Sequence, residues 1–446
     1  MSQPQPAATK FISPKSAVIA LCVLGVATLW LYRLTVRVQG VDDIAWVLRL
    51  VAIQAVIYVP VAWLSLRSSD SRSLLLLGLV FAALFRLSII FAPPYLSDDV
   101  YRYIWDGRVQ AAGINPYRYI PADESLVQLR DEKIYPHINR RDYAHTMYPP
   151  VAEGAFLLLT RFSESVTWMK AAMVGVEAVT IWAIIQVLIS FGFPRQRVLI
   201  YAWHPLAVWE FAGSGHLDAL AIAFIALALL ARRKQAGTLT GVLLACATCV
   251  KIFPAVLFPA LYVRRGWKMP LAFIVTVLIA YLPYLSVGPR GVLGFLGGYA
   301  SERGMVSGEQ FFLLTIARHY ISPNLPTSAY LVFAIVVLGG FSLWLMQFQR
   351  GHLQGDGLQY LRNSLVIASL FMVLLAPHFS WYFAWLIPFL CFIPSVPVFY
   401  LTLASFLLYL TWLGDSPDRV LMLKLLIFAP AFLLLLLVNW WRLKHE

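Results

Sequence analysis

Two adjacent carboxylates, Asp98 and Asp99, follow directly on an apolar segment and open a polar helix predicted over 97–113. Acidic side chains cost several kcal/mol at membrane depth, so acids placed at a membrane surface usually have a function. One of the two is suited to act as a general base that removes a proton from an attacking hydroxyl group. The alternative is that both acids only cap the helix, where Ser97 is a good N-cap and acids suit the helix dipole.

The same predicted helix carries two arginines. Arg102 lies one turn after Asp98, at the i, i+4 spacing that allows an ion pair. Arg108 shares a helix face with Ile104 and Trp105, which predicts a helix that lies at the bilayer interface.

Polar residues also gather around a predicted helix break at 213–215. Glu210 stands just before the break, and His216 and Asp218 follow it at the start of the next apolar span. A broken helix at an interface presents backbone N–H groups and polar side chains to an anion. The alternative is a simple turn with a solvated acid, although a carboxylate just before a membrane turn is unusual.

Lys251 is the most informative basic residue, because it lies within a long apolar stretch. A lysine there is costly unless its ammonium group meets water or an anion. At the tip of a short helical pair, predicted over 237–250 and 253–263, it would offer a point charge to a phosphate group. Snorkelling of the side chain to lipid headgroups is the alternative.

Two aromatic segments complete the set of candidates. Tyr148 precedes two prolines that suit the start of a helix, which predicts a rigid wall beside the acid helix. His378 and Tyr382 lie in a turn between two apolar spans. There they either line a groove or belong to an aromatic belt at the membrane interface.

The composition indicates the kind of structure that must position these residues. Hydrophobic residues make up 60% of the chain and charged residues 13%, about half the charge of a soluble protein. The net charge of +13 would suit nucleic acid, but the basic residues cluster between apolar spans, in the positive-inside pattern of cytoplasmic loops. We therefore predict a multi-pass integral membrane protein, in a plasma or inner membrane, with no nucleic-acid partner.

We predict an all-α polytopic membrane helix bundle of about 12–14 spans, in a single domain over 1–446. Orientation by the basic clusters places the segments 93–147 and 287–327 outside, as two loops with juxtamembrane helices that cover the outer face. The segment 148–162 is expected to begin and end on that outer side. The predicted spans are 16–33, 44–66, 73–92, 166–190, 198–212, 217–231, 237–250, 253–263, 269–286, 328–348, 364–377, 381–394, 396–413 and 419–441.

Taken in order, these segments resemble the GT-C superfamily of membrane glycosyltransferases, and are most similar to its polyprenyl-phosphate-mannose-dependent mannosyltransferases. The chain departs from many relatives in having two spans before the span that leads into the acid loop. It also has His216-Leu217-Asp218 where close relatives have HND. The matching motifs are LSDDVYRYIWDG, GINPY at 113–117, Tyr148–Pro150, His204–Leu206 with Gly215–Leu220, Lys251–Pro254 and Pro377–Pro388.

The resemblance implies transfer of a hexose or pentose from a polyprenyl-phosphate sugar, within the lipid bilayer, to a hydroxyl group of a glycan, lipid or protein. It implies a single, inverting displacement on the extracytoplasmic side, periplasmic or lumenal. We expect no cofactor, and a divalent metal is not favoured because two adjacent acids on one helix rarely converge on one ion. The residues implied are Asp98 and Asp99 for catalysis, Lys251, Arg102 and Arg108 for the donor phosphate, and Tyr148, Glu210, His216, Asp218, His378 and Tyr382 for substrate binding.

A transporter or flippase of lipid-linked sugars, without transfer chemistry, is the alternative function. Such proteins are expected to show an internal repeat and charges at the membrane midplane. The sequence has no evident repeat, and its charges are predicted near one face of the membrane.

Overall fold

The computed structural model describes residues 13–38, 44–348 and 357–445, and every regular element within these ranges is a helix. The all-α prediction is therefore confirmed. In this described part, eight helical segments are long and apolar enough to cross a membrane. They are formed by α1 (Pro14–Val38), α2 (Ile44–Arg67), α3 (Arg72–Ile89), α6 (Val166–Ser190), α12 (Lys268–Tyr281) with η6 (Leu282–Val287) and α13 (Gly288–Gly291), α16 (Thr327–Phe348), α19 (Val396–Ala404) with η8 (Ser405–Leu413), and α20 (Pro417–His445).

Shorter apolar helices accompany the eight long ones, among them α10 (Gly237–Thr248) and α17 (Gln359–Leu375), and α9 (Asp218–Arg233) packs against α10. Three predicted spans, 198–212, 253–263 and 381–394, are not continuous α-helices. Prolines interrupt each of them, since a proline lacks the N–H group that a helix interior needs. The pieces are η3 (Arg195–Val198), α7 (Leu199–Ala202), α8 (Pro205–Ala207) and the π-helical turn η4 (Val208–Gly213), then η5 (Phe253–Leu257) and α11 (Phe258–Leu261), then η7 (Ser380–Leu386) and α18 (Ile387–Leu390).

The irregular segment at the centre of the bundle is enclosed by protein. Every residue from 198 to 219 is buried. Irregular backbone is tolerated at membrane depth only where protein or a water-filled cavity covers it, because hydrocarbon satisfies no backbone hydrogen bonds. The long helices provide that cover.

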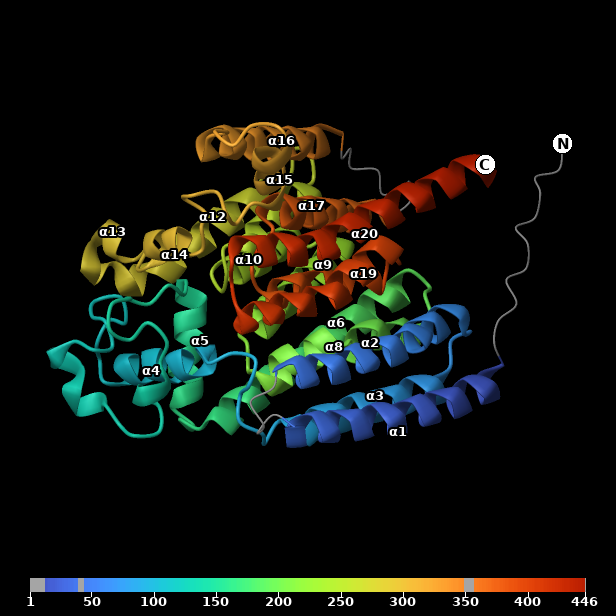
Figure 1. The fold of residues 1–446 in the computed structure, drawn as a ribbon, viewed down its shortest axis with the longest axis horizontal. Coiled ribbons are helices and arrows are strands. Elements are labelled where there is room, and N and C mark those ends of the chain that lie inside the picture. The colour runs from blue at the N-terminus through green and yellow to red at the C-terminus, as the bar shows by residue number, and fades with distance from the viewer. Residues whose placement is uncertain (1–12, 39–43, 349–356, 446) are drawn as a thin grey trace.

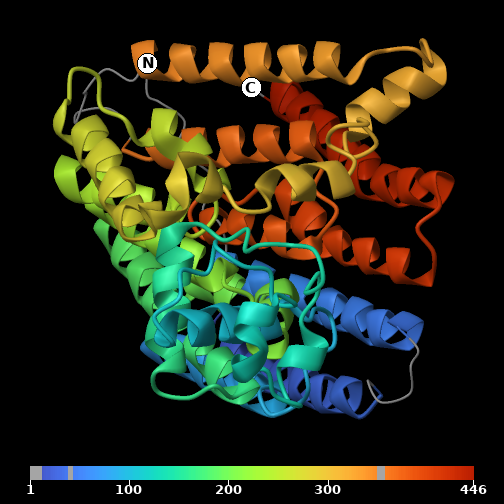
Figure 2. The same ribbon diagram turned by 90° about the vertical axis from the view of Figure 1, so that its left-hand side faces the viewer.

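Short helices gather at one end of the long ones, at the left of Figure 1. Figure 2 looks onto this end, where α4, α5 and the loop between them lie. The eleven residues of α5 are too few to span a bilayer. The elements at this end are α4 (Asp99–Ala111), η1 (Glu124–Leu129), η2 (Tyr135–His137), α5 (Pro150–Thr160) and α14 (Leu296–Glu302), and α15 (Phe312–Tyr320) lies in the same segment, 287–327, as α14.

The predicted helix over 97–113 is observed as α4, packed on α5. A Cβ atom on Gly107 would lie 2.5 Å from the Phe156 carbonyl oxygen, so only glycine allows this close approach. The rings of Tyr103 and Phe156 stack at 4.7 Å between centroids. Ile104 and Trp105, which the sequence places toward the bilayer, are instead buried in protein at 0% and 1% exposure.

Two buried charges hold the segment that leads into the acids. Arg86 on α3 forms an ion pair of 2.6 Å with Glu177 on α6, and it also donates to the Ala202 carbonyl. Lys170 on α6 donates to the Ala92 carbonyl at 2.7 Å, just beyond the end of α3. A cation at the carbonyl end of a helix is electrostatically favourable. Lys170 therefore holds the turn between α3 and Asp98 in place.

Candidate active site

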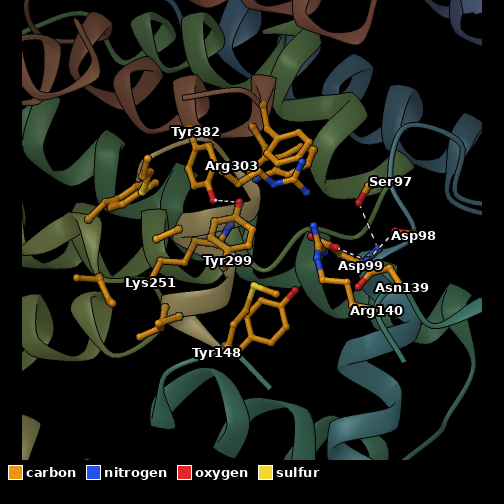
Figure 3. A pocket seen from close by; sticks show the side chains of 18 of the residues that line it. Ser97, Asp98, Asp99, Asn139, Arg140, Tyr148, Lys251, Tyr299, Arg303 and Tyr382 are labelled. Atoms are coloured by element: carbon orange, nitrogen blue, oxygen red, sulfur yellow. Dashed lines mark hydrogen bonds between the residues drawn. The ribbon is translucent and has the colours of Figure 1, made fainter. Parts of the chain in front are cut away.

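A cavity of about 620 Å³ opens at the end of the bundle where α4 begins. The acid pair and Lys251 line this same cavity, as Figure 3 shows, with Tyr148 below them and Tyr382 beside Lys251. Residues from distant parts of the chain therefore meet here: the start of α4, the loop around 139–148, the turn after α10, helix α14 and the start of η7.

Asp98 and Asp99 converge on one amide group. The Asn139 side-chain nitrogen donates to an oxygen of Asp98 at 2.8 Å and to an oxygen of Asp99 at 2.7 Å. The carboxylate of Asp98 makes no capping bond to the helix, while the Ser97 hydroxyl oxygen accepts from the Asp99 N–H at 3.2 Å. Asp98 therefore does not cap α4 with a side-chain hydrogen bond, and its carboxylate lies at the cavity.

The surroundings of Asp98 disfavour its charged form. Desolvation by the cavity wall raises the pKa of this carboxyl, and the neighbouring charge of Asp99 acts in the same direction. The hydrogen bond from Asn139 opposes both effects by stabilising the carboxylate. The cavity thus holds a carboxyl group whose pKa is raised by burial and by a neighbouring charge, as is common at acid–base sites.

The predicted ion pair between Arg102 and Asp98 is wrong. Arg102 instead pairs with Asp106, one turn further along α4, at 2.8 Å, and both side chains are buried. Asp98 is the N-cap residue and lies outside the helical row, which leaves Asp106 as the i, i+4 partner. Arg102 also donates to the Ala144 carbonyl and is not among the residues that line the cavity.

Arg108 is likewise remote from the cavity. Its guanidinium pairs with Asp131 and with Glu164, each at 2.8 Å. The structure therefore does not bring the two predicted arginines of α4 together with Lys251.

Two other arginines line the cavity, and sequence reasoning missed both. Arg140 pairs with Glu302 of α14 at 2.7 Å. Arg303 lies with its guanidinium 4.4 Å from the ring centre of Phe379, and among the described residues it has no ion-pair partner. Each stands in one of the two long segments 93–147 and 287–327, but loop arginines are too common for sequence to single them out.

Lys251 lies in the turn between α10 and η5, as predicted. Its ammonium group forms an ion pair with Asp218, which is fully buried, and lies 4.9 Å from the ring centre of Tyr382. Trp385 donates to the other oxygen of Asp218 at 2.9 Å. The lysine side chain is only 13% exposed and points inward, which argues against snorkelling to lipid headgroups.

Asp218 therefore stands behind Lys251 and holds it. The carboxylate of Asp218 is 0% exposed and is not among the residues that line the cavity. The alternative of a solvated acid after the helix break is wrong at this position.

Glu210 and His216 form a second buried layer behind the acids. Glu210 accepts hydrogen bonds from the Tyr409 hydroxyl at 2.7 Å and from His216 Nδ1 at 2.8 Å. The His216 ring lies against Trp381, with 4.3 Å between ring centres. Its Nε2 atom is 3.9 Å from a carboxylate oxygen of Asp99. This layer is within reach of the acids and not in the cavity itself.

Aromatic side chains form the remaining wall. Tyr382 and Tyr299 share a hydrogen bond of 3.2 Å between their hydroxyl groups, and Tyr148 lines the opposite side. His378 lies outside the main cavity, where its Nε2 atom bonds to the Arg303 carbonyl oxygen at 3.1 Å. Of the two turn residues that the sequence singles out, Tyr382 alone lines the cavity.

The chemistry available is a pair of carboxylates with Arg140 beside them, and with Lys251 and Arg303 elsewhere on the wall of the same aromatic-lined cavity. No three His, Cys, Asp or Glu side chains gather as a metal site within the described part of the chain. The cavity combines an acceptor of protons with positive charge for an anion.

Comparison with known proteins gives one family. A family model described as alpha-(1->6)-mannopyranosyltransferase, N-terminal domain, matches residues 15–265, more than half of the 446 residues. The matched region contains the acid pair, Tyr148, the Glu210–His216 layer and Lys251. No curated protein matches the chain.

Proposed function

Since the chain belongs to the alpha-(1->6)-mannopyranosyltransferase family and is a membrane glycosyltransferase, we propose that it moves a hexose from a polyprenyl-phosphate sugar to a hydroxyl acceptor. Mannose is the hexose that the family favours. The acceptor belongs to a glycan, a lipid or a protein at the extracytoplasmic face. The observation that carries the proposal is the single cavity lined by both the acid pair and Lys251. The family match favours transfer over transport without chemistry.

The acid pair supplies the base. A carboxylate takes the proton of the acceptor hydroxyl while its oxygen attacks the anomeric carbon. The bond from that carbon to the phosphate oxygen breaks, and the polyprenyl phosphate leaves with the electron pair. One displacement inverts the anomeric centre, and such base assistance is typically worth about 10²–10⁴-fold in rate.

Other side chains of the cavity wall supply positive charge for the departing phosphate. Lys251 is placed as a point charge, and Arg303 and Arg140 offer guanidinium groups on the same cavity. Fixed cations aimed at developing negative charge stabilise a transition state without reorganisation at the moment of reaction. Arg303 and Arg140 thus take the place that the sequence assigns to Arg102 and Arg108.

The charges at the other end of the bundle support an extracytoplasmic site. Arg195 pairs with Asp70 between α2 and α3, and Arg233 donates to the Ser190 carbonyl at the end of α6. This basic group lies at the end of α6 away from α5, and positive loops mark the cytoplasmic side.

The proposal includes no metal ion. Its support is the position of the Asn139 amide nitrogen, a hydrogen-bond donor that lies where an ion shared by Asp98 and Asp99 would lie. A donor group at that point suits two carboxylates that accept hydrogen bonds rather than two that bind one cation.

The test is turnover by the purified protein with a panel of polyprenyl-phosphate sugars, followed by release of polyprenyl phosphate. We expect release with at least one hexose donor, and none from the double variant Asp98→Asn/Asp99→Asn. The matched control is Asp142→Asn, at a carboxylate that is 72% exposed outside the cavity. Undiminished turnover by the double variant would refute the base assignment.

A further inference from the structure

We propose that His216 and Glu210 form a relay that accepts the proton from Asp99 after it has left the acceptor hydroxyl. The inference rests on the proposed function and deepens it, because it makes Asp99 rather than Asp98 the base. His216 and Glu210 are positioning residues, since they act through Asp99 and do not touch the sugar.

The hydrogen bonds of Glu210 fix the tautomer of His216. An ionised carboxylate only accepts hydrogen bonds, and Glu210 accepts one from Tyr409 and one from His216 Nδ1. The proton of the neutral imidazole therefore lies on Nδ1, which leaves a lone pair on Nε2. That Nε2 atom is buried, makes no hydrogen bond, and faces a carboxylate oxygen of Asp99 at 3.9 Å.

The 3.9 Å between His216 Nε2 and the Asp99 oxygen suits two atoms that are both hydrogen-bond acceptors. A lone pair on His216 Nε2 and an ionised Asp99 cannot share a hydrogen bond, so they stand apart while the site is at rest. Once Asp99 holds the acceptor's proton, its O–H group becomes a donor, and Nε2 is the buried acceptor beside it. Hydrogen bonds of this kind are often long without substrate and tighten in the reacting complex.

The proton balance closes within these three residues. The proton moves from the acceptor hydroxyl to Asp99 and then to Nε2, which restores the Asp99 carboxylate and makes His216 an imidazolium. The negative charge of Glu210 stabilises that imidazolium through the Nδ1–H bond of 2.8 Å. After product leaves, the proton returns from Nε2 to Asp99, which lines the cavity, and from there passes to water, which restores the starting state.

The fold holds this pair in place. The π-helical turn η4 and the break after it allow the His216 N–H to donate to the Glu210 carbonyl at 2.9 Å, so backbone and side chains of the two residues are joined. Trp381 covers the imidazole ring on one side. Among the described residues His216 is paired with Asp99 and not with Asp98, so the relay serves only one of the two acids.

The test is steady-state kinetics of His216→Gln and Glu210→Gln. We expect kcat to fall about 10- to 100-fold in each, part of the usual gain from acid–base catalysis, with the donor KM within about twofold. The double variant should fall no further than the worse single variant, because both act on one step. The control is His319→Gln, at an exposed histidine on α15.

Two further variants separate failure of the relay from failure of the proposed function. Tyr409→Phe removes one donor to Glu210 without touching His216; a loss of kcat with an unchanged donor KM supports the relay, and an unchanged kcat contradicts it. Inactive Asp99→Asn with unaffected kcat in both His216→Gln and Glu210→Gln overturns the relay alone. Full turnover by Asp99→Asn, with Asp98→Asn inactive, overturns the choice of Asp99 and the relay together. Turnover by both single variants and by the double variant overturns the proposed function.

Discussion

Replacing Lys251 by methionine removes two interactions at once. The ammonium group is the ion-pair partner of Asp218, whose carboxylate is fully buried and keeps only the hydrogen bond from Trp385. Breaking one side of a buried pair costs about 3–5 kcal/mol, because the other charge is left uncompensated. We therefore expect Lys251→Met to lower the melting temperature.

The same change removes a cation from the cavity. A hydrogen bond to a charged group is worth about 1.5–3 kcal/mol, which corresponds to roughly 10- to 100-fold in kcat/KM for the polyprenyl-phosphate donor. The double variant Lys251→Met/Asp218→Asn separates the two effects, since it removes the stranded charge. We expect it to recover most of the stability and none of the donor use.

The assay is release of polyprenyl phosphate at varied donor concentration, with thermal unfolding of the same detergent-solubilised samples. Lys133→Met, at an exposed lysine of the outer loop, is the control for loss of a lysine in general. Recovery of donor use together with stability in the double variant would refute the reasoning, because Lys251 would then act only as the partner of Asp218.

Three other predictions follow from neighbouring charges. Burial raises the pKa of Asp98, so the folded state is favoured while this carboxyl is protonated, below about pH 4, and that stability is lost as the pH rises. Asp98→Asn removes the charge, and it should therefore raise the melting temperature at pH 7 but not at pH 4. Arg303→Met should lower donor kcat/KM about tenfold, while Arg290→Met, at an exposed arginine of α13, should not change it. Arg102→Leu should destabilise the fold by about 3–5 kcal/mol by stranding Asp106, measured by thermal unfolding, with an unchanged donor KM in the folded fraction.

The residues that the sequence locates best are those whose charge conflicts with their surroundings. Asp98, Asp99 and Lys251 stand beside or within apolar segments, and that conflict is visible without a structure. Arg140 and Arg303 carry no such signal, because an arginine in a polar loop is unremarkable until the fold brings it to a cavity. Their roles therefore depend on tertiary contacts that local spacing does not encode.

Local rules also fail where they allow two answers. Arg102 has an acid one turn before it and one turn after it. Because α4 begins at Asp99, Asp98 lies outside the helix and Asp106 is the partner. Hydropathy likewise predicts 198–212 as a span, because most of its residues are apolar, although Pro205 prevents a continuous helix. Length and composition fix the class of the fold better than they fix the course of the chain inside it.

The enclosed, irregular segment from 198 to 219 constrains how the protein can be assembled. Its backbone cannot take this shape against lipid, so the shape must form after neighbouring helices have inserted and closed around it. Glu210 and His216 belong to this late-forming segment. A partly assembled bundle in the membrane would thus carry the acids of α4 without the layer behind them, and the enzyme would mature only when its last helices dock.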